Sequence, residues 1–372
     1  MKTILTILGT RPEAIKLAPV LRELNRRKGK FRSVVCVTGQ HRELLDPMLD
    51  HFGIRPDSDL HVMRENQSLA ALTARLLAAL DPVLAEAKPD WVVVQGDTTT
   101  VMAAALAAYY RGIRVAHVEA GLRTDDKHSP FPEEINRRMA GVLADAHFAP
   151  TARAVRNLRR EGVPPGRICL SGNTVVDALN WTVRMARANP PRWPGDIPPL
   201  RKGVRWILVT GHRRENFGQG MEEMCMALRD IAEALPRCEL VYPVHLNPHV
   251  REPVNRLLGG HPRIHLAKPV EYPVMAGLLK GAWLVLTDSG GIQEEAPTFG
   301  VPCLVMRGTT ERPEGVRMGV AKLVGADRRK IVAAVRRLDR DPKAYARMAT
   351  GGNPYGDGHA AVKIVDWLEQ GG

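Results

Sequence analysis

The feature that most constrains the fold of this chain is a repeated alternation of short aliphatic runs with longer segments rich in Ala, Leu and Arg. The short runs contain mainly Val, Ile, Leu and Thr. Continuously apolar strands that are separated by helices predict a parallel sheet with helices on both faces. We expect helices at residues 69–87 and 99–110, among others. We expect strands at residues 3–8, 33–38, 91–95, 115–119, 205–210, 239–242, 283–287 and 303–306.

The alternation occurs twice along the 372 residues, and a chain of this length usually forms two domains. It runs from residue 1 to about residue 167 and begins again at residue 205, after a proline-rich passage at 189–199. We therefore predict two Rossmann-like α/β domains with parallel sheets, over residues 1–168 and 169–355. Ligands of such sheets bind outside the carboxyl ends of the strands, so we expect the active site there, in the cleft between the domains.

The composition excludes several classes of protein. Hydrophobic residues make up 44% of the chain and charged residues 25%, which is ordinary for a globular protein and argues against disorder. No apolar run approaches the ~18 residues of a membrane span, and the apolar run at residues 3–8 is too short for a secretory signal. We therefore expect a cytoplasmic protein with no membrane segment. The five cysteines form no CxxC motif, which predicts reduced thiols and no metal site.

The formal net charge of +13 raises nucleic-acid binding as an alternative function. The basic residues are spread along the chain, however, and aromatic residues make up only 5%, so stacking platforms for bases are scarce. A basic surface that attracts a small anionic substrate is the better interpretation. We therefore expect no nucleic-acid partner.

A first candidate site follows the first predicted strand. Gly9 and Thr10 turn the chain toward a helix, and Pro12 suits a first helical position. Arg11 and Lys16 lie one or two turns apart at the positive end of this helix, which is a place for a phosphate or another anion. The alternative is a helix cap with two solvated cations. The segment is not a Walker A loop, because no Gly-Lys-Ser/Thr follows.

Acidic side chains follow the later strands of the first domain. Asp97 and Glu119 stand just after or at the end of neighbouring predicted strands, so both carboxylates are expected to converge at one edge of the sheet. Glu133 lies in a third acidic segment further along the chain. Two structural alternatives remain open: Asp97 as the cap of the following helix, and Glu119 as the partner of Arg123.

The second domain carries the stronger nucleotide signal. A predicted strand leads into Ser289, Gly290 and Gly291, and two glycines before a helix let the backbone approach a pyrophosphate. Glu295 falls about one turn further along, where a carboxylate can accept two ribose hydroxyl groups. Neither half of the chain contains a G-x-G-x-x-G fingerprint, so NAD is disfavoured and we expect no cofactor.

Further cationic side chains follow two more strands of the second domain. His212 and Arg213 come directly after the strand at 205–210, on the opposite wall of the predicted cleft. Arg312 lies in a segment after the last predicted strand. A single histidine after a strand usually has a structural role, but the cationic neighbours of His212 favour a functional role for it.

These segments together resemble the non-hydrolysing UDP-N-acetylglucosamine 2-epimerases. The resemblance extends from residue 9 to residue 358 and therefore covers nearly the whole chain. The matching segments are residues 9–16, 96–100, 117–123, 132–137, 211–216, 244–248, 288–295, 310–315 and 353–358.

The resemblance implies a GT-B architecture, with a C-terminal helix within residues 356–372 returning to the first domain. It also implies a homodimer. The catalytic residues that it implies are Asp97, Glu119, Glu133 and His212. The residues that it implies hold UDP are Arg11, Lys16, His212, Tyr272, Ser289, Gly290, Gly291, Glu295 and Arg312.

Some bacterial members of the family bind a second UDP-sugar, which activates the enzyme. The resemblance implies that the corresponding positions here are Gln40, His41, Glu43, Arg213 and His245. Some of those members have a glutamine where this chain has Glu43.

The reaction that the resemblance implies interconverts UDP-N-acetylglucosamine (UDP-GlcNAc) and UDP-N-acetylmannosamine (UDP-ManNAc) by elimination of UDP and its addition to a 2-acetamidoglucal. Three alternatives remain open. A hydrolysing relative would release N-acetylmannosamine and UDP, and a GT-B glycosyltransferase would need an acceptor. A nucleotide-sugar sensor would show no turnover, although the three carboxylates argue against it.

Overall fold

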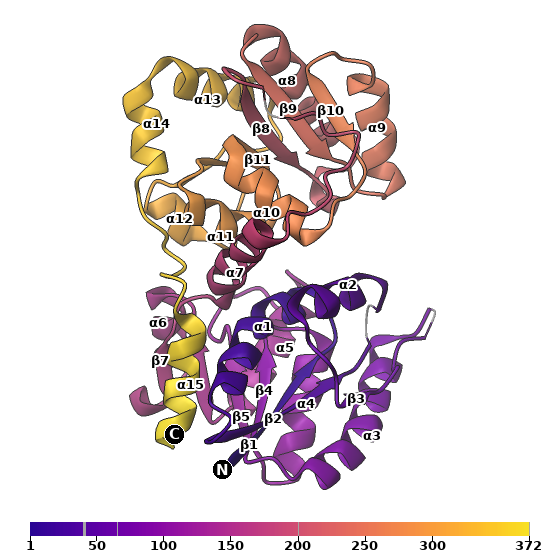
Figure 1. The fold of residues 1–372 in the computed structure, drawn as a ribbon, viewed down its shortest axis with the longest axis vertical. Coiled ribbons are helices and arrows are strands. Elements are labelled where there is room, and N and C mark those ends of the chain that lie inside the picture. Colours follow the sequence, from indigo (N-terminus) through magenta and orange to yellow (C-terminus); the bar gives the residue numbers. More distant parts are fainter. Residues whose placement is uncertain (40–41, 65, 200, 372) are drawn as a thin grey trace. The chain divides into compact units, whose positions relative to one another are not determined.

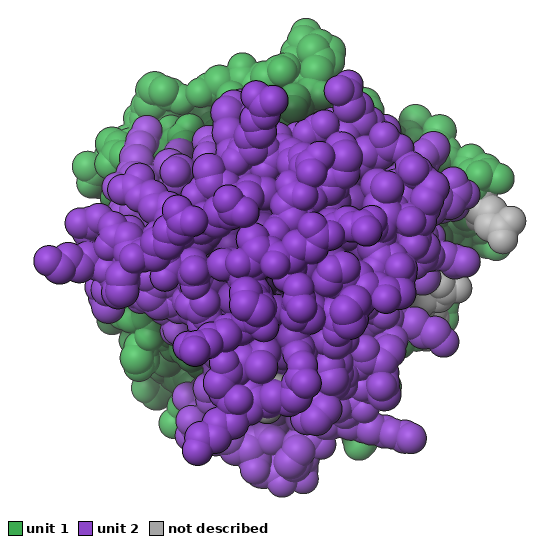
Figure 2. Space-filling model, turned by 90° about the horizontal axis from the view of Figure 1, so that it is seen from above, with its two compact units in different colours: residues 1–181, 355–372 green, residues 182–354 purple. Residues whose placement is uncertain are grey.

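The computed structural model describes residues 1–39, 42–64, 66–199 and 201–371, and of residues 42 and 43 it describes the backbone only. The chain forms two compact units (Figure 2). Unit 1 comprises Met1–Trp181 and Tyr355–Gly372, and unit 2 comprises Thr182–Pro354. Within the described residues, no helix combines the length and the apolar character needed to cross a membrane.

Unit 1 contains a seven-stranded sheet in the order β3-β2-β1-β4-β5-β6-β7, in which every neighbouring pair is parallel. Helices lie on both faces of the sheet (Figure 1). The strands are β1 Lys2–Leu8, β2 Phe31–Val37, β3 Ser58–Asp59, β4 Trp91–Gln95, β5 Arg114–Val118, β6 Ala146–Ala149 and β7 Ile168–Leu170. The helices are α1 Arg11–Arg26, α2 Arg42–Phe52, α3 Leu69–Ala87, α4 Thr99–Tyr110, α5 Glu133–Leu143, α6 Ala152–Arg160, a 3-10 turn Pro165–Arg167, α7 Thr174–Ala188, which continues into unit 2 after Trp181, and α15 Ala360–Gln370.

Unit 2 repeats the arrangement with a six-stranded parallel sheet in the order β10-β9-β8-β11-β12-β13. The strands are β8 Arg205–Thr210, β9 Cys238–Pro243, β10 Ile264–Ala267, β11 Ala282–Thr287, β12 Cys303–Val305 and β13 Ala321–Leu323. The helices are α8 Gln219–Ala234, α9 Pro248–Leu258, α10 Tyr272–Gly281, α11 Gly290–Glu295, α12 Pro313–Arg317, α13 Arg328–Arg340 and α14 Pro342–Ala349, with 3-10 turns at Arg214–Asn216 and Ala296–Phe299.

This architecture confirms the predicted fold of two doubly wound parallel sheets. The expected helices over residues 69–87 and 99–110 are α3 and α4. The side chains of β4 are all buried, as a continuously apolar strand in a sheet covered on both faces requires. The predicted strand at 115–119 is shifted by one residue, because β5 spans Arg114–Val118 and Glu119 has a left-handed backbone with φ of 64°.

The first compact unit extends beyond residue 168, where we placed the end of the first domain. Residues 169–181 pack with unit 1, because Trp181 contacts the Phe52 ring at 5.1 Å and lies under the guanidinium group of Arg22 at 4.6 Å. The chain therefore leaves unit 1 within α7 rather than at β7. The proline-rich passage at 189–199 therefore lies inside unit 2, after the boundary between the units.

The C-terminal helix α15 completes unit 1. Its Trp367 packs edge-on against the rings of Trp91 at 5.7 Å and Phe148 at 5.6 Å. The carboxylate of Asp177 accepts hydrogen bonds from the first backbone N–H groups of α15, those of Ala360 and Ala361, at 3.2 and 3.0 Å. This long-range cap anchors the returning chain.

Candidate active site

The carboxylate of Glu13 connects the turns that follow β1 and β4. One of its oxygens accepts hydrogen bonds from the backbone N–H groups of Gly9 and Thr10 at 2.7 Å and from the Thr10 hydroxyl at 2.9 Å. The other oxygen accepts the Thr98 hydroxyl at 2.6 Å. Burial raises the pKa of Glu13, and the four hydrogen bonds oppose that effect. Glu13 was not among the residues predicted from the sequence, although its Thr-x-x-Glu spacing is the signal of a capping box.

The two cations predicted at the start of α1 have different surroundings. Arg11 is exposed, and its side chain has no ion-pair partner within the described ranges. Lys16 is buried, and its ammonium group contacts Oε1 of Glu119 at 2.5 Å. The alternative of two solvated cations is therefore wrong for Lys16.

Three donors hold the carboxylate of Glu119, which directly follows β5. Lys16 and Asn173 donate to Oε1, at 2.5 and 3.3 Å, and the side-chain amide of Gln95 donates to Oε2. Glu119 is 8% exposed, and its left-handed backbone is uncommon for a residue other than glycine. The carboxylate is therefore oriented by contacts from α1, β4 and the turn before α7.

Asp97 lies in the turn between β4 and α4, and its side chain is partly exposed. Arg137 donates to Oδ2 of Asp97 at 2.5 Å, and the Asn136 side chain donates to its backbone carbonyl at 3.0 Å. The cap of α4 is Thr98, whose hydroxyl accepts the N–H of Val101 at 3.3 Å. The alternative that Asp97 caps this helix is therefore wrong.

His117 supports the turn that carries Asp97. Its Nε2 lies 2.7 Å from the carbonyl oxygen of Gly96. Burial lowers the pKa of His117 to about 4, so the ring is neutral near pH 7. A neutral imidazole can donate from Nε2 to this carbonyl, so His117 holds the turn without adding charge.

Glu133 is the first residue of α5 and lies one helical turn before Arg137. Positions four apart share one face of a helix, so α5 presents Glu133 on the face that carries the arginine bound to Asp97. Glu133 is half-buried, and its Oε2 atom has no hydrogen-bond partner within the described residues. The predicted carboxylates Asp97, Glu119 and Glu133 thus all belong to unit 1.

Other charged side chains of the matching segments serve the structure. Arg123 donates to both carboxylate oxygens of Glu161, at 2.7 and 2.6 Å, so the alternative pairing of Arg123 with Glu119 is wrong. Glu134 is fully buried and accepts a hydrogen bond from Arg138 at 2.9 Å. These pairs leave Glu119 to its own three donors.

In unit 2, the buried carboxylate of Asp288 organises the turn after β8. It accepts the backbone N–H groups of His212 and Arg213, both at 2.9 Å, and the side-chain amide of Asn216 at 3.2 Å. Asp288 itself stands directly after β11. The turns after two neighbouring strands are therefore joined by Asp288, to which the sequence alone assigned no role.

Two arginines lie beside the glycine turn at the start of α11. A Cβ atom built on Gly290 would lie 3.8 Å from Nη2 of Arg213 and 3.9 Å from Cζ of Arg312. The guanidinium group of Arg312 also pairs with Glu294. Two guanidinium groups thus lie beside the glycine turn predicted to bind the pyrophosphate, and guanidinium forks suit phosphate oxygens.

The other residues predicted to bind UDP are neighbours in the same unit. The Tyr272 hydroxyl donates to Oε1 of Glu295 at 3.0 Å, which joins two of the residues predicted to bind UDP. The rings of His212 and His245 stack, with centroids 5.6 Å apart. Unit 2 therefore brings together the predicted UDP-binding residues that it contains.

The predicted activator site is described in part. Gln40 and His41 lie outside the described residues, as does the side chain of Glu43. Arg213 and His245 belong to unit 2, where each lies close to a residue predicted to bind UDP.

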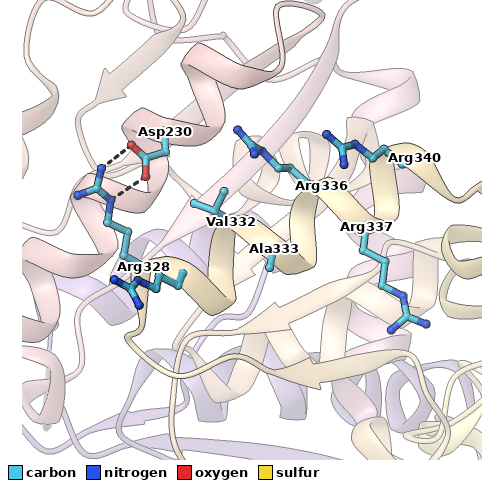
Figure 3. A pocket seen from close by; sticks show the side chains of 8 residues that line it. Asp230, Arg328, Val332, Ala333, Arg336, Arg337 and Arg340 are labelled. Carbon is cyan, nitrogen blue, oxygen red and sulfur yellow. Dashed lines mark hydrogen bonds and ion pairs between the residues drawn. The ribbon is translucent and has the colours of Figure 1, made fainter.

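A basic groove along α13 contains none of the predicted site residues (Figure 3). Arg328 donates to both carboxylate oxygens of Asp230 on α8, at 2.6 and 2.7 Å. The other lining residues are Arg329, Val332, Ala333, Arg336, Arg337 and Arg340. Within the described residues, no group of three or more His, Cys, Asp or Glu side chains could hold a metal ion.

Comparison with known proteins identifies close relatives over the full length. The profile of the family described as UDP-N-acetylglucosamine 2-epimerase matches residues 22–369. The UDP-N-acetylglucosamine 2-epimerases of Salmonella typhimurium and Escherichia coli K12 are 51% and 52% identical to this chain, each over 98% of both chains. The crystal structure of UDP-GlcNAc 2-epimerase from Neisseria meningitidis, bound to UDP-GlcNAc, is similar with a TM-score of 0.92. It is 44% identical and covers 99% of this chain and 100% of its own.

Proposed function

This chain belongs to the UDP-N-acetylglucosamine 2-epimerase family, and we propose that it interconverts UDP-GlcNAc and UDP-ManNAc by elimination and re-addition of UDP. The observation that carries the proposal is the grouping of Glu119, Asp97 and Glu133 in unit 1, with cations bound to two of the three carboxylates. Unit 2 supplies a separate group of side chains suited to a nucleoside diphosphate.

The substrate's chemistry explains why UDP leaves first. Carbon 2 bears an acetamido group, and no neighbouring carbonyl acidifies its proton. An ordinary carboxylic acid, with a pKa of about 4 in water, has a conjugate base too weak to remove such a proton directly. Cleavage of the C1–O bond gives carbon 1 oxocarbenium character and acidifies the C2 proton. Loss of that proton gives 2-acetamidoglucal and UDP.

The return half of the reaction inverts carbon 2. A proton is added to carbon 2 from the opposite face, and the diphosphate oxygen bonds to carbon 1 again. The numbers of atoms and electrons are therefore the same in substrate and product. Acid and base groups are needed on both faces of the ring, which is why three carboxylates suit the reaction.

The departing diphosphate needs stabilisation because negative charge develops on its leaving oxygen. Arg312, Arg213 and the backbone N–H groups of Gly290 and Gly291 are suited to this role, with His212 beside them. Their positions are set in advance by Asp288 and Glu294, so little reorganisation is needed as the charge develops.

The proposal predicts that the purified protein interconverts the two UDP-sugars in deuterated water and that deuterium enters carbon 2. Proton NMR follows both events, in samples with a chelator and without added NAD. Turnover that stops with the chelator and returns with metal would contradict the proposed absence of a metal. Free N-acetylmannosamine formed in step with UDP would instead establish hydrolysis.

Glu295→Ala is expected to weaken UDP binding by ~1–3 kcal/mol, the scale for loss of a charged hydrogen-bond partner. The carboxylate is 6% exposed and already accepts the Tyr272 hydroxyl. Isothermal titration calorimetry with UDP measures the effect. Glu233→Ala is a control with the same charge change, because Glu233 is exposed on α8 and pairs with Arg229. Equal UDP affinity in the two variants would remove Glu295 from the ribose site.

We also propose that the chain forms a homodimer through the outer face of α5. This face exposes Ile135, Met139 and Val142 at helical spacing, and Val142 is 86% exposed. Sedimentation velocity is expected to give twice the mass of the 41.0 kDa chain. Val142→Glu should shift the protein toward the monomer, because a charge would enter the interface. A monomeric wild-type protein at micromolar concentration would contradict this assignment.

A further inference from the structure

Two neutral amides contact the Glu119 carboxylate in addition to its cation. Gln95 donates to Oε2, while Asn173 donates to Oε1 at 3.3 Å, the oxygen that also contacts Lys16. Both amide side chains are 3% exposed. Each carboxylate oxygen is therefore restrained separately, which fixes the plane of the carboxylate as well as its position.

The orientation of the Asn173 amide follows from its other contacts. Its Oδ1 atom accepts the backbone N–H of Val175 at 3.0 Å, as the cap of α7. A flipped amide would place its NH₂ group against that N–H and its oxygen against the carboxylate. Nδ2 must therefore face Glu119.

The Gln95 amide is oriented by the carboxylate alone. Its Nε2 donates to Glu119, while its Oε1 has no partner within the described part of the chain. The opposite orientation would place two oxygens in contact. A buried amide oxygen without a hydrogen-bond partner lowers the stability of the fold. The contact between Gln95 and Glu119 is therefore present in spite of that cost.

The returning C-terminal segment holds the turn that carries Asn173. The backbone N–H of Asn173 donates to the carbonyl of Tyr355 at 2.6 Å. Gly356 has φ of 138°, and a Cβ atom on it would lie 3.4 Å from both Asn173 N and Gly172 Cα. Residues 355 and 356 are the first of unit 1 after the chain returns from unit 2. The motif at 353–358 thus supports the turn that holds Glu119.

We propose that Gln95 and Asn173 are positioning residues for Glu119, and that the C-terminal segment at Tyr355 and Gly356 supports Asn173 in this role. The inference rests on the proposed function, because it assigns Glu119 to the acid/base chemistry. Lys16 supplies the counter-charge, and the two amides set the direction of the carboxylate. Loss of that direction lowers the rate of proton transfer without removing any group that binds UDP.

Asn173→Asp and Gln95→Glu are the main test variants. Aspartate caps a helix about as well as asparagine, so Asn173→Asp retains the cap of α7 while replacing the donor to Glu119 with an acceptor. Each variant is expected to lower kcat by ~10–100-fold, the effect of a catalytic group displaced by about 1 Å. KM and the UDP dissociation constant should stay within about twofold. Asn173→Ser, which also caps, replaces Asn173→Asp if that protein does not fold.

Asn180→Asp is the matched control, because Asn180 lies on the same helix and its amide nitrogen faces Gly358 rather than Glu119. It should retain the wild-type kcat. A kcat within twofold of wild type for both Gln95→Glu and the folded Asn173 variant would overturn the inference. So would a loss of UDP affinity in proportion to kcat, since that would place the amides in binding. A wild-type protein without epimerisation would instead refute the proposed function.

Discussion

Glu119→Gln, Asp97→Asn and Glu133→Gln are each expected to lower kcat by ~10²–10⁴-fold, the usual effect of losing a general acid or base. Each substitution removes the charge and the proton-transfer capacity while nearly preserving the shape of the side chain. UDP affinity should change far less, because Arg213, Arg312 and the glycine turn proposed to stabilise its diphosphate belong to unit 2. Neutralising a carboxylate near the diphosphate reduces the electrostatic repulsion between these two groups, which does not weaken UDP binding.

The structure makes this test more specific than the sequence allowed. Asparagine at position 97 cannot act through the cap of α4, because Thr98 is that cap. Glutamine at position 119 cannot act through Arg123, because Arg123 pairs with Glu161. A large loss of turnover in these two variants therefore cannot come from a lost cap of α4 or a lost pair with Arg123.

The measurements are kcat, UDP affinity by calorimetry and the melting temperature of each variant. Glu119→Gln also deprives Lys16 of its counter-charge, so its turnover is measured well below its melting temperature. Glu161→Gln is the control: it should lower the melting temperature through Arg123 and spare kcat. Near-wild-type turnover in any of the three variants removes that residue from the mechanism.

Lys16→Met is expected to lower the free energy of unfolding by ~3–5 kcal/mol. The Lys16 and Glu119 side chains are 11% and 6% exposed, so removal of the cation leaves a carboxylate in a largely buried position. The double variant Lys16→Met with Glu119→Gln should lose less stability than the sum of the two single variants, because it contains no unpaired charge at this position.

Urea denaturation followed by tryptophan fluorescence measures these differences. Lys30→Met removes the same charge from an exposed pair with Glu369 and should cost much less, because solvent screens that pair. Strict additivity of the two substitutions at Lys16 and Glu119 would contradict an energetically coupled buried pair.

Most of the fold was predictable because strands buried on both faces leave a clear sequence signal. The strand at 91–95 was predicted with the bounds that β4 has. The missed strands are short or carry little β-branched character, such as β3 with two residues and β6, which reads Ala-His-Phe-Ala. Their extended conformation depends on pairing with neighbouring strands, which a local pattern does not report.

The sequence proposed the residues of the candidate site, but it gave only part of the contacts between them. Parallel strands end at one edge of a sheet, so their post-strand positions identified Asp97 and Glu119 as residues of that edge in unit 1. The sequence also placed Lys16 at a predicted anion site, but it did not identify the Glu119 carboxylate as the group that Lys16 contacts. Gln95 and Asn173 were missed, because buried amides have no distinctive spacing.

The sequence by itself determined the fold class, the repetition of the sheet and the segments proposed to carry chemistry, because periodicity and post-strand position are local properties. Only the tertiary structure decided which side chains meet. Glu119 receives donors from positions 16, 95 and 173, and α15 is capped by Asp177 more than 180 residues earlier. Likewise, only the backbone angles and hydrogen bonds of the folded chain show that Thr98, and not Asp97, caps α4. Contacts between distant segments depend on how strands pair and helices pack, and that information resides in the folded chain as a whole.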